Sequence, residues 1–208
     1  MALWQELKIQ REDRKLLTAF VLSGLVIMSI GGIFALLMLL VRTPVFSLFS
    51  SNLYYQAMTG HSLMMFVFWL GFIQTAFLIA AGTVLIRQRL WSYRLAWVGW
   101  GIMVLAALLA LTGVLRGANV SYHALLPLAQ QFPSAWLIYL SFILLALGMS
   151  LVVVDFLATI FSAVERKGSF TSWAALFQRI PISTFAATAG LLIAIPGLIA
   201  AFKVFIPA

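Results

Sequence analysis

The sequence predicts an all-α integral membrane protein with five transmembrane helices, a cytoplasmic N-terminus and an external C-terminus. Three observations lead to this fold class. Of the 208 residues, 64% are hydrophobic and only 9% are charged, which is typical of a multi-pass membrane chain. Apolar runs long enough to cross a bilayer recur along the chain. Lys and Arg are also distributed unequally between alternate connections.

The apolar runs place each predicted element in order. Residues 1–15 are polar and amphipathic, and we expect a short interfacial tail on the cytoplasmic side. The second run is long enough to require tilt or extension beyond the bilayer. We find no repeat and no soluble domain, so residues 1–208 are expected to form a single membrane domain. The predicted spans are about 16–41, 56–86, 95–115, 134–164 and 181–202.

The basic residues give the orientation. The N-terminal tail carries four Lys and Arg, and the second-to-third and fourth-to-fifth connections carry three each, ten in all. Arg42, Arg116 and Lys203 lie on the other side. This asymmetry predicts a multi-pass protein of the cell membrane, with the lipid bilayer as its surroundings. Topology explains the net charge of +8 without a nucleic-acid partner, and the absence of Cys excludes thiolate metal sites.

His61 is a lone histidine inside the second apolar run. An imidazole in hydrocarbon is costly and usually serves a purpose, most often a metal or a proton. Met58 and Met65 lie beside it at helical spacing, and Phe68 and Thr75 are expected to return to the same face. We therefore predict that His61 is an axial haem ligand, with apolar walls from Met58, Met65 and Phe68. The alternative is a histidine hydrogen-bonded within a helix bundle.

The topology also predicts a depth for this site. His61 would enter from outside, about five residues into its helix, which places it roughly 7–8 Å below the outer helix end. A haem bound there would lie in the outer half of the membrane.

Other polar residues in the apolar runs are weaker candidates. Asp155 is the only carboxylate inside a predicted span, and it either transfers protons or makes a structural contact, such as a pair with an Arg. His123, in an external loop, is either solvated or a haem or metal ligand. Gln74 should face away from His61 and contact another helix or hold water. The pair Gly31 and Gly32 indicates a close helix contact.

One motif resembles a known family. The stretch Tyr54-Tyr-Gln-Ala-Met-Thr-Gly-His61-Ser is similar to the second helix of subunit I of the haem–copper oxygen reductases. There a Tyr-Gln-x-x-Thr-x-His-Gly pattern carries an axial ligand of the low-spin haem, and the B-type branch has Tyr-Tyr-Gln-x-Leu-Thr-x-His. The stretches Tyr122-His-Ala-Leu-Leu-Pro-Leu, Ala135-Trp-Leu-Ile-Tyr-Leu and Val154-Asp155 also resemble that branch, so the likeness covers roughly residues 16–202.

The sequence departs from the family pattern in ways that bear on its role. Ser62 stands where the family usually has Gly after the histidine. The histidine patterns of the family's sixth, seventh and tenth helices do not occur, so the resemblance implies that another chain supplies the second axial ligand, the oxygen-binding haem and the copper. We expect the N-terminal portion of a split subunit I, or a piece of a longer one. The turn Arg87-Gln-Arg-Leu-Trp-Ser lacks the Asn/Asp entry of the A-type proton channel, which also favours the B-type branch.

The resemblance implies a respiratory function. We expect part of a proton-translocating cytochrome c or quinol oxidase that is not catalytic alone, with His61 on the low-spin haem. Electrons would come from a copper- or cytochrome-bearing subunit and pass to a haem–copper centre completed by a partner chain that carries the remaining helices. The alternatives are a stand-alone b-type cytochrome using His61 and His123, a nitric oxide reductase relative, and a cofactor-free assembly subunit.

Overall fold

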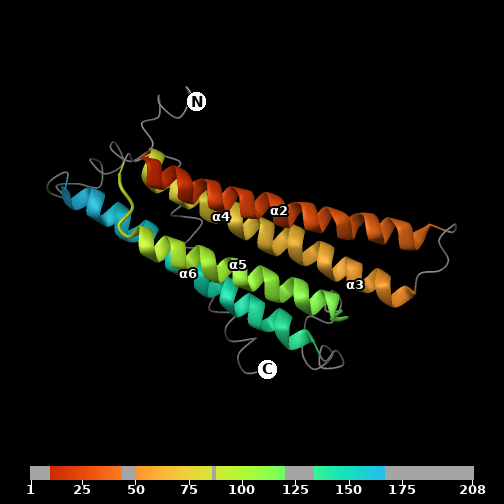
Figure 1. Cartoon of the computed structure of the whole chain (residues 1–208). Helices are drawn as coiled ribbons and strands as arrows, with labels where there is room; N and C mark the ends of the chain where they lie inside the picture. Colours follow the sequence, from red (N-terminus) through yellow and green to blue (C-terminus); the bar gives the residue numbers. More distant parts are fainter. Residues whose placement is uncertain (1–9, 44–49, 86–87, 120–133, 167–208) are drawn as a thin grey trace.

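The structure is a computed structural model that describes residues 10–43, 50–85, 88–119 and 134–166 (Figure 1). These residues form helices and the turns between them, without a strand. α3, η2, α4 and η3 follow one another without a break and make one long rod, in which η2 and η3 are π-helical. The elements are α2 (Arg11–Arg42), α3 (Ser51–Ser62), η2 (Leu63–Phe68), α4 (Trp69–Ala80), η3 (Ala81–Leu85), α5 (Tyr93–Leu115) and α6 (Ala135–Arg166).

Four of the resulting rods are long and apolar enough to cross a membrane. The prediction of an all-helical membrane fold is therefore confirmed for the part of the chain that the structure describes. The predicted fifth span at 181–202, and most of the tail at 1–15, lie outside the described residues. The side of the membrane that each terminus faces stays a prediction.

Two helix starts differ from the predicted span limits. α2 begins at Arg11, so its first turn contains the charged residues assigned to the tail. The second rod begins at Ser51 rather than near residue 56, because the Ser50 side chain accepts the Leu53 N–H and caps the helix. Hydropathy alone marks the apolar part of a helix, whereas a polar cap adds turns outside it.

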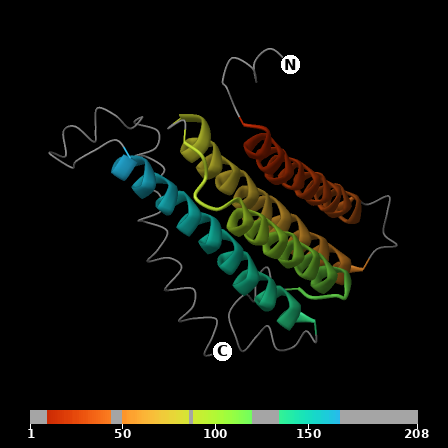
Figure 2. The same cartoon turned by 60° about the vertical axis from the view of Figure 1, so that its left-hand side comes forward.

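The rods pack closely where glycines remove side chains. α5 and α6 cross at Gly99 and Gly148, where a Cβ on Gly99 would lie 2.8 Å from the Gly148 carbonyl oxygen. The second rod lies between α2 and α6: a Cβ on Gly24 of α2 would contact Ile73, and one on Gly71 would contact Leu145 of α6. Figure 1 and Figure 2 show this side-by-side arrangement.

Hydrogen bonds tie the helix ends together at both ends of the bundle. At one end, the Tyr93 hydroxyl donates to Asp13 at 2.6 Å, which joins the starts of α5 and α2. At the other, the Ser134 hydroxyl donates to the Arg116 carbonyl at 3.2 Å, which joins α6 to the end of α5. The basic residues of the described chain follow the same division. Arg11, Arg14, Lys15, Arg89, Arg94 and Arg166 share the first end, and Arg42 and Arg116 the second.

Candidate functional site

The His61 ring makes a hydrogen bond to the neighbouring helix. Its Nδ1 lies 2.9 Å from the carbonyl oxygen of Gly31 in α2. A carbonyl oxygen only accepts, so Nδ1 must carry the hydrogen and donate it. A neutral imidazole in this tautomer keeps its lone pair on Nε2, the arrangement found in metal-ligating histidines whose other nitrogen is held by a carbonyl. His61 is partly buried, so it is neither a packed core residue nor a solvated one.

Small residues bring α2 close enough for this contact. A Cβ on Gly31 would lie 2.7 Å from the Met65 Cγ, and a Cβ on Gly60 would lie 2.7 Å from the Phe34 ring. Both distances are shorter than real Cβ contacts, so a side chain at either position would force its neighbour to shift. The expected helix contact at Gly31 is therefore present. It does not extend to Gly32, where a Cβ would meet nothing within 4 Å.

A π-helical segment begins two residues after His61. η2 spans Leu63–Phe68 and replaces the i→i+4 pattern by i→i+5, which changes the angular phase of every later residue. The expectation that Phe68 and Thr75 share the face of His61 assumed an uninterrupted α-helical period, so its geometric basis is wrong. Both residues are buried in the helix core, and the Thr75 hydroxyl donates to the Gly71 carbonyl of its own helix at 2.7 Å. π-Segments inside membrane helices are frequent at functional sites.

The predicted cofactor walls fall into two groups. Met58 and Met65 are partly buried, as His61 is, and offer a polarizable, apolar surface. Phe68 has 0% exposure, which leaves it no accessible surface for a ligand and makes it the packed support of the segment that carries His61. A ring nitrogen with a free lone pair and soft apolar neighbours fit one side of a haem.

The depth of the site differs from the prediction. α3 begins at Ser51, so His61 follows ten residues of helix instead of five. At 1.5 Å per residue this is about 15 Å from that helix end. The ring therefore lies nearer to the middle of the helix than the sequence indicated.

The other polar residues of the His61 motif tie α3 to the end of α5. The Gln56 amide donates to the Val114 carbonyl, and the Thr59 hydroxyl lies 3.3 Å from the Asn119 side-chain oxygen. Sequence analysis gave these residues no role. The signal that could have found them is their spacing: Gln56 and Thr59 are three residues apart on one face of the helix, beside the loop that follows α5.

Asp155 binds backbone rather than an arginine. Its side chain has 0% exposure, and Oδ1 accepts the Ser92 N–H at 2.7 Å. One turn further along α6, the Thr159 hydroxyl accepts the Trp91 N–H at 2.9 Å. Together they hold the turn that leads into α5. Among the described residues, Asp155 Oδ2 is the one buried side-chain nitrogen or oxygen without a hydrogen-bond partner.

The contacts of Asp155 are those of an anchor for the α5 N-terminus. The expected pair with an Arg is not found in the described ranges. Proton transfer by Asp155 stays a prediction.

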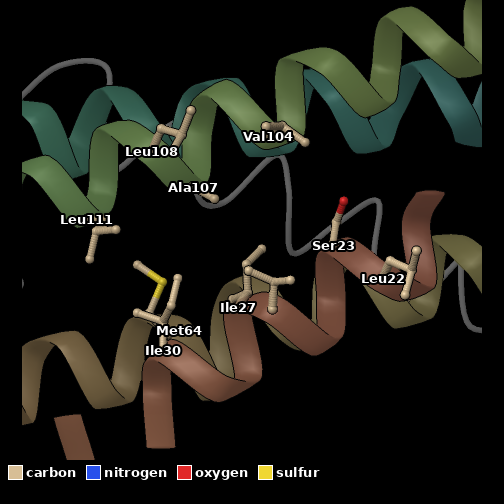
Figure 3. Close-up of a pocket in the computed structure, with 10 residues that line it drawn as sticks. Leu22, Ser23, Ile27, Ile30, Met64, Val104, Ala107, Leu108 and Leu111 are labelled. Atoms are coloured by element: carbon tan, nitrogen blue, oxygen red, sulfur yellow. The ribbon is translucent and has the colours of Figure 1, made fainter. Parts of the chain in front are cut away.

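An apolar cavity of about 280 Å³ opens between α2 and α5 (Figure 3). Met64 lies at its edge, but neither His61 nor any of the three predicted cofactor walls lines it. Its open, almost wholly apolar lining suits a lipid chain more than a group with a polar ligand. The lining residues are Leu22, Ser23, Val26, Ile27, Ile30, Met64, Val104, Ala107, Leu108 and Leu111.

The described part of the chain holds no cluster of metal-ligating side chains around His61. It contains no group of three or more His, Cys, Asp or Glu that could hold a metal ion. His123, the other histidine, lies outside the described residues. Within the described residues, His61 is therefore the one imidazole.

Comparison with known proteins gives one match. The family model described as "Cytochrome C and Quinol oxidase polypeptide I" matches residues 15–207, nearly the entire chain. No curated protein and no solved structure matches.

Proposed function

The chain belongs to the cytochrome c and quinol oxidase polypeptide I family, and on that premise we propose that His61 is an axial ligand of the low-spin haem of a respiratory terminal oxidase. The chain would form the N-terminal portion of the haem-bearing subunit in the cell membrane. A partner polypeptide with the remaining helices would supply the second axial ligand and the copper of the oxygen-reducing centre. A copper- or cytochrome-bearing subunit would deliver electrons.

The observation that carries this proposal is the hydrogen bond from His61 Nδ1 to the Gly31 carbonyl. In the neutral ring it fixes the tautomer and holds the plane of the imidazole. A histidine hydrogen-bonded within a helix bundle would make the same contact, so it is the family match over residues 15–207 that favours the ligand role over that alternative.

The surrounding residues would set the environment of the bound group. Met58 and Met65 would cover its face with soft apolar side chains and keep water away, and Phe68 would pack behind them. A low-spin haem supplies one-electron storage and transfer. The part played by the protein is ligand identity, hydrogen bonding to the ligand and burial, which together tune the reduction potential.

The direct test compares the two histidines of the chain. Purify the complex from cells that express wild type, His61→Ala or His123→Ala, and record reduced-minus-oxidised spectra. We expect His61→Ala to lose the low-spin haem band and His123→Ala to retain it. An unchanged band in His61→Ala would refute the proposal. Loss of the band in both variants would favour a stand-alone b-type cytochrome with both histidines on one haem.

The nature of the partner separates the nearer alternatives. Metal analysis of the purified complex should find copper beside haem iron if oxygen is the substrate. Non-haem iron instead of copper would indicate a nitric oxide reductase relative. A complex whose haem content does not depend on this chain would indicate an assembly subunit.

A further inference from the structure

The cavity between α2 and α5 offers almost no hydrogen-bonding partner to a ligand. All of its lining residues except Ser23 are apolar. The Ser23 hydroxyl oxygen already accepts the indole N–H of Trp100 at 3.1 Å. A polar ligand would lose its hydrogen bonds to water on entering the cavity, whereas a hydrocarbon chain has none to lose. The chemistry of the lining therefore selects an apolar occupant.

The cavity opens between exposed side chains of the two helices. Leu22 of α2 is 54% exposed and Leu108 of α5 is 56% exposed. Met64 of the second rod is buried and lines the inner side. Figure 3 shows the lining residues of α2 and α5 on the two sides of the cavity. Since both helices are long and apolar enough to cross a membrane, the hydrocarbon of the bilayer reaches this opening.

Both walls of the cavity lead to a cation at the same end of the bundle. In α5, Arg94, Gly101 and Leu108 follow at intervals of seven residues, and in α2, Lys15 precedes Leu22 by seven. Both helices are α-helical without interruption over these residues, so about two turns separate the members and each series keeps to one side. Gly101 leaves the α5 side bare, because a Cβ there would meet nothing within 4 Å.

The two cations are accessible to an anion. Arg94 is exposed, and its guanidinium makes no ion pair within the described ranges. Lys15 pairs with Glu12 at 2.8 Å, but both side chains are about half exposed, and a pair of this kind contributes little to stability. The neighbouring Asp13 accepts the Tyr93 hydroxyl. On α2 and at the start of α5, the basic residues outnumber Glu12 and Asp13; they are Arg11, Arg14, Lys15, Arg89 and Arg94.

The spacing between the cations and the cavity matches a phospholipid. Arg94 precedes Val104 by ten residues, or about 15 Å along α5. Trp97 and Trp100 lie between them with ring centroids 5.4 Å apart, and indoles favour the boundary between headgroups and hydrocarbon. One leaflet contributes about 15 Å of hydrocarbon inside that boundary. A phosphate beside Arg94 would therefore carry its acyl chain to the depth of the cavity.

We propose that the cavity between α2 and α5, together with Lys15 and Arg94, is a binding site for one anionic phospholipid. One acyl chain fills the cavity, and the phosphate lies between the two cations. Charge complementarity selects this occupant, because basic residues beside a membrane span attract anionic headgroups. The site is separate from the proposed haem site, since His61 does not line it.

Native mass spectrometry of the purified complex tests the headgroup. The delipidated complex is incubated with equal amounts of palmitoyl-oleoyl phosphatidylglycerol and of phosphatidylcholine with the same chains. We expect a phosphatidylglycerol adduct whose retention falls about fivefold in Arg94→Gln, the effect of one cation beside a membrane. Arg116→Gln, at the other end of α5, is the matched control and should retain the adduct. Equal retention of the two lipids, or an unchanged adduct in Arg94→Gln, would overturn the proposal.

The role of the cavity is tested by filling it and by shortening the lipid. Val104→Trp places an indole in the cavity and should abolish the adduct, whereas Val98→Trp, on the exposed side of α5 outside the cavity, should retain it. Dihexanoyl phosphatidylglycerol has the same headgroup with chains too short to reach the cavity. We expect it to bind wild type at least about tenfold more weakly, because few methylene groups are buried. Equal binding of the two chain lengths would contradict the chain site.

Photo-crosslinking distinguishes a lipid from a protein occupant. Benzoylphenylalanine is placed at Leu108, at the opening, or at Val98 as control, and the complex is irradiated after a detergent wash that removes bulk lipid. We expect a phosphatidylglycerol adduct at Leu108 and none at Val98. Crosslinks from Leu108 to another polypeptide, or to residues 181–202 of this chain, would overturn the proposal. None of these measurements uses the haem band, so they stand or fall independently of His61.

Discussion

His61 and Asp155 are both ionisable residues within membrane-spanning helices, and their surroundings differ. His61 is partly exposed, and its Nδ1 makes a hydrogen bond to the Gly31 carbonyl of the neighbouring helix. Asp155 is fully buried and one oxygen holds the Ser92 N–H at the start of α5. On the proposed function, His61 would be a cofactor ligand and Asp155 a structural anchor. The two residues differ in the exposure of the side chain and in which polar atom is left without a partner, although both are ionisable groups in an apolar helix.

The largest loss of stability should come from the anchor. Asp155→Ala leaves the buried Ser92 N–H without an acceptor, which should cost about 2 kcal/mol of unfolding free energy. Denaturant titration of the purified complex measures this loss. The haem band should not move, because Asp155 is remote from His61. A shifted band would mean that the two regions are coupled.

The variant Asp155→Asn tests whether Asp155 acts only as an anchor for the start of α5 or also transfers protons. Its side-chain oxygen can still accept the Ser92 N–H, so we expect stability close to wild type and turnover within about twofold. If turnover collapses while the fold remains stable, Asp155 transfers protons and the anchor interpretation is incomplete. The unpartnered Oδ2 is the atom on which that outcome would depend.

At the His61 region the expected effect is spectroscopic. Gly31→Ala places a Cβ 2.7 Å from the flexible Met65 side chain, so α2 and the second rod must separate slightly. We expect a displaced low-spin band and a loss of about 1 kcal/mol in stability. Gly32→Ala is the matched control, since its Cβ would meet nothing within 4 Å. Equal spectra for both variants would argue that the Gly31 contact does not orient the ring.

The smallest expected effect is at Gln56. Gln56→Leu loses the hydrogen bond to the Val114 carbonyl between α3 and α5, with an expected cost of about 0.6 kcal/mol. Thr112→Val serves as control, because its hydroxyl bonds only within α5. Thermal unfolding of the two variants should rank Gln56→Leu below the control. The reverse order would show that the His61 motif is not tied to α5 through this amide.

Strong hydrophobic runs made the membrane-spanning helices predictable. The exact helix starts and the π-helical segments could not be predicted, because they depend on local capping and backbone geometry. The four described rods coincide with apolar stretches, because only helices satisfy the backbone in hydrocarbon. Helix starts were off by several residues where a polar cap such as Ser50 extends the helix. The π-helical η2 was not foreseen, because its i→i+5 pattern has no signature in the spacing of apolar residues.

The sequence identified His61 as the candidate residue, but it did not predict which atoms the polar side chains of the spans would contact. His61 stood out because it is an imidazole in an apolar run, and Gly31 because small residues allow close helices. The partner of Asp155 could not be predicted. Ser92 is 63 positions away in the sequence, and its backbone N–H carries no residue-type signal.

Imidazole complementation of His61→Gly tests the central claim most directly. The substitution removes the ring and leaves space for a free imidazole beside Gly31. We predict that the purified His61→Gly complex lacks the low-spin haem band and regains it in proportion to added imidazole. A low-spin band already present without imidazole would contradict the assignment of His61 as an axial ligand.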